Sequence, residues 1–357
     1  MSTDASTPAH AEPLVIAGRE GSITRITLNR PRAISALTLE MFELIGRALE
    51  VAQSDGSSAI LLDGAGELGF CGGGDIKEIS SGDSLLILST EYRLDLALAE
   101  SRVPVVGVMD GITMGGGIGL AGHAKHRVVT ERSRLAMPEV RIGIVPDVGG
   151  HLLLAHAPGR LGEMLAVTAG EMGPGDAIAL GFADYFVPSE RLAALGEALA
   201  GGEDPATACA RLAEPAPDSP VLAAGEWWGP IAEEVFGAQH PPAFEDAAGT
   251  AARVIRALET AGDDGRIAAE WAAETVRGMC PVSVAVTLAQ IDRTRRLGLS
   301  LAEVLADDLR VLGRIAARPD FAEGVRAQVI DKDRTPRWSP SRIEDLDPAE
   351  LEAILAP

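Results

Sequence analysis

The stretch Asp110-Gly-Ile-Thr-Met-Gly-Gly-Gly-Ile-Gly119 decides the fold class. It follows an apolar run at residues 103–109 that predicts a buried strand, and it leads into a helix expected to begin near Gly116. The same order occurs earlier, where a short apolar run at 59–62 precedes the loop Phe70-Cys-Gly-Gly-Gly-Asp-Ile-Lys77. Strands that alternate with helices in this way predict an α/β architecture.

The elements on either side of these loops extend the pattern. β-branched residues predict a strand at 22–28, and Thr38 is expected to cap the helix that follows it. Further helices are predicted at 91–98 and 152–155, and further strands at 127–130 and just before 187. After about residue 188 the strand signals fade, and Ala, Leu, Arg and Glu predict helices at 192–200, 247–261, 267–277, 282–297 and 301–317.

The organisation expected from this pattern is a tail, a core and a helical region. Residues 1–12 are small and polar and predict a disordered tail. Residues 13–200 are expected to form the core with the active site, and residues 201–357 a mainly helical C-terminal region. Within that region, residues 201–245 are rich in Pro, Gly, Ala and Glu and give no clear assignment.

The composition of the 357-residue chain excludes several classes of protein. It is 46% apolar and 23% charged, as in ordinary globular proteins, and only 4% aromatic, so Ala, Leu, Val and Ile must build the core. The formal net charge of −21 repels phosphate backbones and anionic membranes, which argues against a general nucleic-acid or membrane partner. A local basic pocket for a small anion remains compatible with this charge.

The cysteines and apolar runs indicate the compartment. Cys71, Cys209 and Cys280 are widely spaced without a Cys-x-x-Cys pair, which favours free thiols over a disulfide framework or a zinc site. No apolar run resembles a signal peptide or a membrane span. The expected protein is therefore soluble and cytoplasmic.

The two glycine-rich loops are candidates for an oxyanion hole. Glycine lets a ligand approach bare backbone N–H groups, and a helix N-terminus adds a positive dipole. One N–H from each loop could converge on a single carbonyl oxygen. The alternative is that the glycines serve only tight turns and close packing, and the residues alone leave both interpretations open.

Two carboxylates form the second candidate feature. Glu139 follows Met137-Pro138, and Asp147 follows Pro146, at the two ends of a small apolar run. The alternative is a pair of solvated loop acids, the usual fate of Asp and Glu.

Two other features call for structural interpretations. The spacing of His123 and His126 places them on one helix face, but no further metal ligand accompanies them. Cys71 has no evident partner histidine, so packing is its expected role.

Taken together, the motifs resemble the crotonase (enoyl-CoA hydratase/isomerase) superfamily, and most closely its 3-hydroxyisobutyryl-CoA hydrolase branch. The resemblance covers nearly the whole chain from about residue 13. The stretches that carry it are Leu28-Asn-Arg-Pro31, Phe70-Cys-Gly-Gly-Gly-Asp-Ile76, Glu91-Tyr-Arg93, Asp110-Gly-Ile-Thr-Met-Gly-Gly-Gly117, Ala136-Met-Pro-Glu139, Ile142-Gly143, Pro146-Asp-Val-Gly-Gly150, Asp320-Phe-Ala-Glu-Gly-Val-Arg326 and Ile330-Asp-Lys-Asp333.

The resemblance implies a fold and a set of roles. The fold would be a spiral of ββα units followed by helices. The backbone N–H groups of Gly74 and Gly116 would form the oxyanion hole for a thioester carbonyl. Glu139 matches a catalytic glutamate of the superfamily, Asp147 matches an aspartate typical of the hydrolase branch, and Glu91 matches a substrate-contacting glutamate there.

One comparison within the superfamily separates hydration from hydrolysis. Hydratases carry a second glutamate at the position of Gly119, and they carry glycine at the position of Asp147. The resemblance therefore implies hydrolysis of an acyl-CoA thioester, most plausibly 3-hydroxyisobutyryl-CoA in valine catabolism, with Glu139 acting as nucleophile or as general base on water. The alternatives are an enoyl-CoA hydratase or isomerase acting on another acyl-CoA, and a catalytically silent acyl-CoA-binding protein.

The remaining expectations concern coenzyme A and the assembly. Arg32 and Lys77 are candidates for contact with its phosphates, with solvated surface cations as the alternative. Coenzyme A is part of the substrate, so no separate cofactor or metal is implied, and a homo-oligomer (trimer or hexamer) fits the family. Ser35 replaces a common Asn, and residues 149–156 lack the aromatic residues usual there, which leaves the acyl group open.

Overall fold

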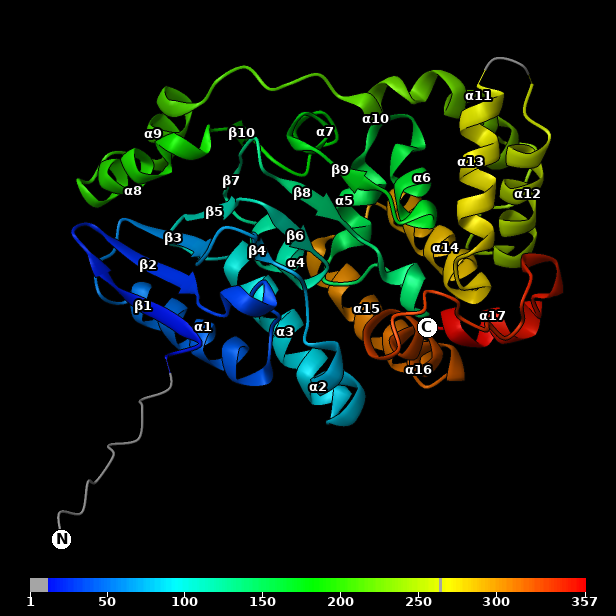
Figure 1. The fold of residues 1–357 in the computed structure, drawn as a ribbon, viewed down its shortest axis with the longest axis horizontal. Helices are drawn as coiled ribbons and strands as arrows, with labels where there is room; N and C mark the ends of the chain where they lie inside the picture. The colour runs from blue at the N-terminus through cyan, green and yellow to red at the C-terminus, as the bar shows by residue number, and fades with distance from the viewer. Residues whose placement is uncertain (1–11, 263–264) are drawn as a thin grey trace, which may run out of the picture.

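The computed structural model describes residues 12–262 and 265–357, arranged around two β-sheets (Figure 1). The tail predicted at residues 1–12 lies outside the described residues, apart from Glu12. The larger sheet has the strand order β1-β2-β3-β5-β7-β10, and the smaller has the order β4-β6-β8-β9. The strands are β1 (Val15–Glu20), β2 (Ile23–Leu28), β3 (Ala59–Gly64), β4 (Gly69–Cys71), β5 (Val105–Met109), β6 (Ile112–Met114), β7 (His126–Val129), β8 (Arg134–Ala136), β9 (Glu171–Met172) and β10 (Tyr185–Phe186).

The chain visits the two sheets in turn and then forms a helix. β3 and β4 lead to α2 (Ile76–Ser81) and α3 (Ser84–Ala99), and β5 and β6 lead to α4 (Gly116–Gly122). β7 and β8 lead to the 3₁₀ turn η2 (Glu139–Ile142) and to α5 (Gly150–His156). Neighbouring strands are parallel except in the β1–β2 and β8–β9 pairs. This repeated ββα unit confirms the predicted crotonase-like spiral.

The central strands β3 and β5 of the larger sheet are buried on both faces, which explains their continuous apolar runs, whereas the edge strand β1 is mostly exposed. In β3, Ile60 and Leu62 join the main core, which contains residues of α1 (Leu39–Ala52) and α3. Leu61 faces the other way and packs with α8 (Leu192–Ala200) and α9 (Pro205–Leu212). Successive side chains of β3 therefore pack into two different apolar clusters, one on each face of the sheet.

Capping residues set the ends of the helices near the site. The Thr38 hydroxyl accepts a hydrogen bond from Met41 N at 3.3 Å, as predicted for the start of α1. The helix predicted at 91–98 begins earlier, at Ser84, because Asp83 caps it through Leu86 N at 3.1 Å. α3 therefore gains nearly two further turns, which reach the mouth of the cavity described below.

The C-terminal part is mainly helical in its described residues, although residues 331–342 form no helix. Segment 201–245, left unassigned from sequence, contains three helices; two of them begin at Asp204-Pro205 and Ser219-Pro220, where a capping side chain precedes a proline. The remaining helices are α6 (Leu161–Thr168), α7 (Pro174–Ala179), α10 (Pro220–Ala223), α11 (Gly225–Phe236), α12 (Ala247–Glu259), α13 (Arg266–Arg277), α14 (Pro281–Leu297), α15 (Leu301–Ile315), α16 (Pro319–Val325) and α17 (Pro348–Leu355).

Three of these late helices close over the spiral. α14 packs on α5, α15 packs on α3, and α16 packs on the η2 turn. Gly143 and Gly324 allow the last contact, because a Cβ at Gly143 would lie 2.6 Å from Asp320 O, and a Cβ at Gly324 would lie 2.4 Å from Ile142 O. One apolar cluster runs from Val15 to Ile354, so the core continues across the predicted boundary near residue 200, and that division of the chain stays a prediction.

None of the helices in the described ranges is long and apolar enough to cross a lipid bilayer.

Candidate active site

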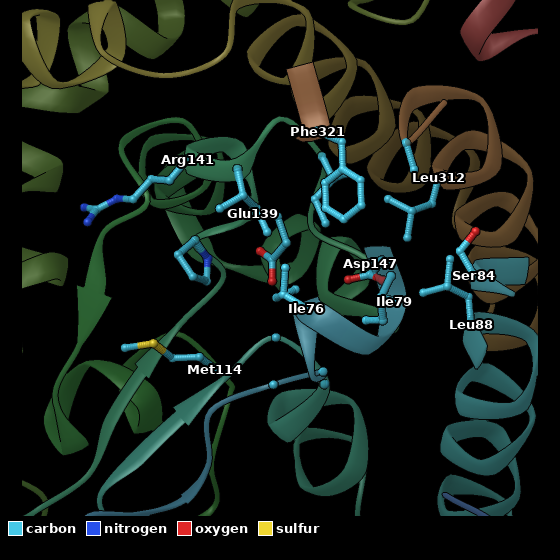
Figure 2. A pocket seen from close by; sticks show the side chains of 18 of the residues that line it. Ile76, Ile79, Ser84, Leu88, Met114, Glu139, Arg141, Asp147, Leu312 and Phe321 are labelled. Carbon is cyan, nitrogen blue, oxygen red and sulfur yellow. The ribbon is translucent and has the colours of Figure 1, made fainter. Parts of the chain in front are cut away.

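A cavity of about 250 Å³ lies where the glycine loops, the η2 turn and the late helices meet (Figure 2). The first glycine loop and α2 form one side, α3 and the second loop form another, and α15 and α16 contribute apolar side chains. Its lining includes Gly72, Gly73, Gly74, Ile76, Ile79, Ser84, Leu88, Glu91, Met114, Gly115, Gly116, Pro138, Glu139, Arg141, Ile142, Ile144, Asp147, Leu312, Ala316, Phe321 and Gln328.

The two glycine loops bring two backbone N–H groups together. Leu37 donates to Gly73 O at 2.9 Å and accepts from Asp75 N at 2.7 Å, so the N–H of the intervening Gly74 faces away from this bridge. Gly116 is the first residue of α4, and its N–H has no partner within the helix. Gly74 N lies 3.5 Å from the point where a Cβ on Gly116 would sit. The amides are thus placed to share one acceptor.

Bare backbone at the second loop also lets two carboxyl groups approach closely. A Cβ at Gly115 would lie 2.9 Å from Glu139 Oε1, and one at Gly116 would lie 2.3 Å from Glu91 Oε1. Gly115 has φ +48° and ψ −118°, a conformation that side chains disfavour. Glycine is therefore required here to hold acidic side chains against the loop.

Glu139 and Asp147 are buried, with exposed fractions of 6% and 7%, and Figure 2 shows both carboxyl groups turned into the cavity. Tyr92 of α3 donates its hydroxyl hydrogen to Asp147 Oδ2 at 2.6 Å. In contrast, Glu139 Oε2 has no hydrogen-bond partner among the described residues. Glu139 therefore keeps a free carboxyl oxygen for a ligand, whereas Asp147 is oriented from behind.

Burial and mutual repulsion raise the pKa values of these acids. The pKa of Asp147 rises to about 7, first through burial and then through the nearby Asp308 carboxylate, although the Tyr92 hydrogen bond partly opposes this. Burial, followed by repulsion from Asp147, also raises the pKa values of Glu139 and Glu91. The pKa of Asp147 thus lies near neutral pH, where a carboxyl group can both hold and release a proton, as acid–base chemistry requires.

Position 119 is closed to a longer side chain. A Cβ at Gly119 would lie 2.7 Å from both Asp95 Oδ2 and Val148 Cβ. Asp95 is fully buried, and burial followed by repulsion from Glu91 raises its pKa. A buried carboxyl group thus already occupies the space beside Gly119.

The structure brings together five of the residues predicted for the site and leaves two outside. Gly74, Glu91, Gly116, Glu139 and Asp147 all line the cavity. Arg32 and Lys77 are exposed on the surface and are not part of its lining, so their contact with phosphates stays a prediction. Arg141 and Gln328, which the sequence analysis did not select, do line the cavity.

The structure also shows the surroundings of the cysteine and the two histidines for which a structural role was predicted. Cys71 is buried, burial raises the pKa of its thiol to about 12, and its Sγ contacts Ser35 O at 3.4 Å, in keeping with a packing role. The placement of His123 and His126 on one helix face was wrong, because α4 ends at Gly122 and His126 begins strand β7. Within the described residues, no three His, Cys, Asp or Glu side chains are grouped to hold a metal ion.

Comparison with known proteins gives the family. The model of the enoyl-CoA hydratase/isomerase family matches residues 23–355. The chain therefore belongs to this family, as the sequence motifs predicted.

Individual relatives refine the placement. The chain is 36% identical over 352 residues to the mitochondrial 3-hydroxyisobutyryl-CoA hydrolase of Rattus norvegicus, an alignment that covers 95% of this chain and 88% of the rat protein. Two crystal structures also match: a carnitinyl-CoA dehydratase from Mycobacterium thermoresistibile (TM-score 0.85, 34% identity, 96% of each chain) and an enoyl-CoA hydratase from Rhodobacter sphaeroides 2.4.1 (TM-score 0.83, 37% identity, 97% of this chain and 98% of that one).

Proposed function

We propose that the protein hydrolyses a short β-hydroxyacyl-CoA thioester, 3-hydroxyisobutyryl-CoA, to 3-hydroxyisobutyrate and coenzyme A. The observation that carries this proposal is the meeting of two unpaired backbone amides and two buried carboxyls in one small cavity. The similarity to the rat hydrolase supports the same reaction. A cavity of about 250 Å³ lies below the roughly 300–1,000 Å³ of drug-sized sites, which suits a short acyl group.

In the proposed reaction, the thioester carbonyl oxygen accepts hydrogen bonds from Gly74 N and Gly116 N. When an oxygen nucleophile attacks the carbonyl carbon, negative charge moves onto that carbonyl oxygen, and the two amides stabilise it. The tetrahedral intermediate then collapses, the C–S bond breaks, and the leaving thiolate takes a proton to become free coenzyme A.

Glu139 supplies the attack by one of two routes. As a general base, it takes a proton from water while the water oxygen bonds to carbon. As a nucleophile, it forms a mixed anhydride that water then cleaves. Asp147 has one of two roles. With a pKa near 7, it can hold a proton and pass it to the leaving sulfur, or its carboxyl group can bind the substrate hydroxyl. Solvent ¹⁸O recovered in the Glu139 carboxyl after one turnover would identify the anhydride route.

A panel of acyl-CoA esters tests the proposed reaction. Purified protein is expected to release free thiol from 3-hydroxyisobutyryl-CoA faster than from acetyl-CoA or 3-hydroxybutyryl-CoA, and to leave crotonyl-CoA unhydrated. Turnover of crotonyl-CoA without thiol release from any ester would overturn the proposal.

Hydration is the second candidate, because the two matching crystal structures are those of a dehydratase and a hydratase. Hydration needs an acid and a base on either side of a C=C bond. The space in which a second glutamate would follow the glycine loop is closed by Asp95 and Val148 around Gly119. This packing favours hydrolysis.

Introducing a glutamate at this position tests that argument. Gly119→Glu is expected to lower the free energy of unfolding by about 1–3 kcal/mol through overpacking, and to create no hydration of crotonyl-CoA. Urea denaturation and a hydration assay measure the two effects. The matched control is Gly46→Glu in α1, where no atom lies within 4 Å of the new Cβ. Efficient hydration by a stable Gly119→Glu protein would contradict the assignment.

The raised pKa values predict an unusual pH profile. Reaction needs one ionised carboxyl in the Glu139–Asp147 pair, so kcat/KM is expected to fall as pH drops through about 7, instead of near 4 as for an exposed acid. Asp147→Asn removes the carboxyl whose pKa places this limb near 7, so the limb should leave that position while turnover slows. A limb that stays near pH 4 in the wild-type protein would contradict the assignment of these acids.

The other expectations stay proposals. Arg32 or Lys77 would bind the phosphates of coenzyme A, which enters as part of the substrate, with no separate cofactor. A homo-oligomer, trimer or hexamer, and a cytoplasmic location are also proposed; light scattering and cell fractionation test them.

A further inference from the structure

Behind Asp147 lies a second pair of buried polar side chains, a histidine and an aspartate, that the proposed reaction does not use. His151 Nε2 of α5 lies 2.8 Å from Asp308 Oδ1 of α15, and both side chains are at most 1% exposed. The oxygen lies off the axis of the ring N–H, so this close contact is not an aligned hydrogen bond. The other ring nitrogen, Nδ1, is held 2.9 Å from Thr294 Oγ1 of α14.

This pair is tied directly to the turn that presents Asp147. Gly149 N donates to Asp308 Oδ2 at 3.0 Å, and Gly150 N donates to Asp147 O at 2.6 Å. Asp308 of α15 therefore contacts this short segment twice, at Gly149 N and at His151, and the turn itself links Gly150 N to Asp147 O. A change in the pair would therefore alter both the position of the Asp147 carboxyl, through the backbone, and its electrostatic surroundings.

Charge gives the pair a second means of action. The acids Glu91, Asp95, Glu139, Asp147 and Asp308 gather around this end of the cavity, and each has a pKa raised first by burial. At Asp147, repulsion from Asp308 raises the pKa further, whereas attraction to His151 lowers it. His151 and Asp308 thus act on the same carboxyl in opposite directions.

We infer that the His151–Asp308 pair is a positioning element that orients Asp147 and sets the pH at which this carboxyl ionises. The kinetic test of this inference rests on the proposed function. The titration of Asp147 can be followed without any reaction. Neither residue lines the cavity, so both act through Asp147 and not on substrate.

Other charged groups near His151 are accounted for by partners of their own. Glu163 of α6 pairs with Arg160 and with Arg295 of α14, and Asp307 of α15 pairs with Arg293 and Arg310. On the far side of the same turn, His123 Nε2 lies 3.1 Å from Val148 O, and its pKa is lowered to about 4, chiefly by burial. The titratable groups that interact with the pair are Tyr92, Asp95, Glu139, Asp147 and Asp307.

The inference is tested by replacing each residue of the pair and measuring whether the acid limb of kcat/KM shifts in opposite directions. His151→Gln removes the attraction that lowers the pKa of Asp147, so the acid limb of kcat/KM should move up by about 0.5–1 pH unit. Asp308→Asn removes the repelling charge and keeps an acceptor for Gly149 N, so the limb should move down by a similar amount. A purely structural role would slow both variants without moving their limbs in opposite directions.

The matched control is His123→Gln, which replaces a histidine on the same turn that is neutral at pH 7 and should leave the limb in place. ¹³C NMR of labelled aspartate, with Asp147 assigned by Asp147→Asn, follows the same titration without substrate. Acid limbs of kcat/KM that do not move, or that move in the same direction in both variants, would overturn the inference. If His151→Gln does not fold, the inference depends on whether the limb of Asp308→Asn moves to lower pH. Shifted titration in a protein that releases no coenzyme A would refute the proposed function alone.

Discussion

Glu139→Gln is expected to lower kcat for release of coenzyme A by about 10²–10⁴-fold, because glutamine can neither take a proton from water nor attack the thioester. The substitution keeps the size of the side chain, and it places an uncharged group where a buried carboxyl has a raised pKa. Folding stability should therefore be unchanged or slightly higher. A thiol-release assay at saturating substrate, together with thermal melting, measures both effects.

The control for this variant is Glu67→Gln, the same change on an exposed turn after β3. It should leave kcat unchanged. Turnover that survives in Glu139→Gln would remove Glu139 from the reaction, whereas coenzyme A binding without any turnover in the wild-type protein would favour a silent binding protein.

Gly116→Ala is expected to lower kcat by about 10²–10³-fold, the typical loss of one oxyanion-hole donor. The new methyl group would lie 2.3 Å from Glu91 Oε1 and 3.1 Å from Leu37 Cδ1, so the start of α4 must move. Movement withdraws Gly116 N from the point that it shares with Gly74 N. Because the amides act mainly on the developing oxyanion, kcat should fall much more than KM rises.

Gly46→Ala in α1 is the control, since open space surrounds its new methyl group. A Gly116→Ala protein that melts like wild type and retains full kcat would show that the amide of Gly116 does not bind the reacting carbonyl.

Local signals explain why much of the fold was predictable. Apolar runs followed by glycine loops mark β3 and β5, and Thr38 marks the start of α1. The start of α3 was missed because its first turns carry few helix signals apart from the Asp83 cap. In segment 201–245, Asp204-Pro205 and Ser219-Pro220 were usable helix starts within an uninformative composition.

The site was predictable only where its residues lie in the motifs themselves. Glu139 and Asp147 flank one short run, so the sequence pointed to both. Asp95 lies four residues after Glu91 on α3, and helical periodicity could have revealed it. Asp308 and Arg141 gave no comparable signal, because only the packing of α15 and the end of the η2 turn bring them to the site.

The position of solvent oxygen in the product tests the central claim most directly. The protein is given 3-hydroxyisobutyryl-CoA in H₂¹⁸O, and the product is analysed by mass spectrometry after many turnovers. Hydrolysis by the amides and carboxyls of this cavity predicts ¹⁸O in the new carboxylate and one free coenzyme A for each product molecule. Label in the β-hydroxyl group of an intact thioester, with no coenzyme A released, would contradict the account.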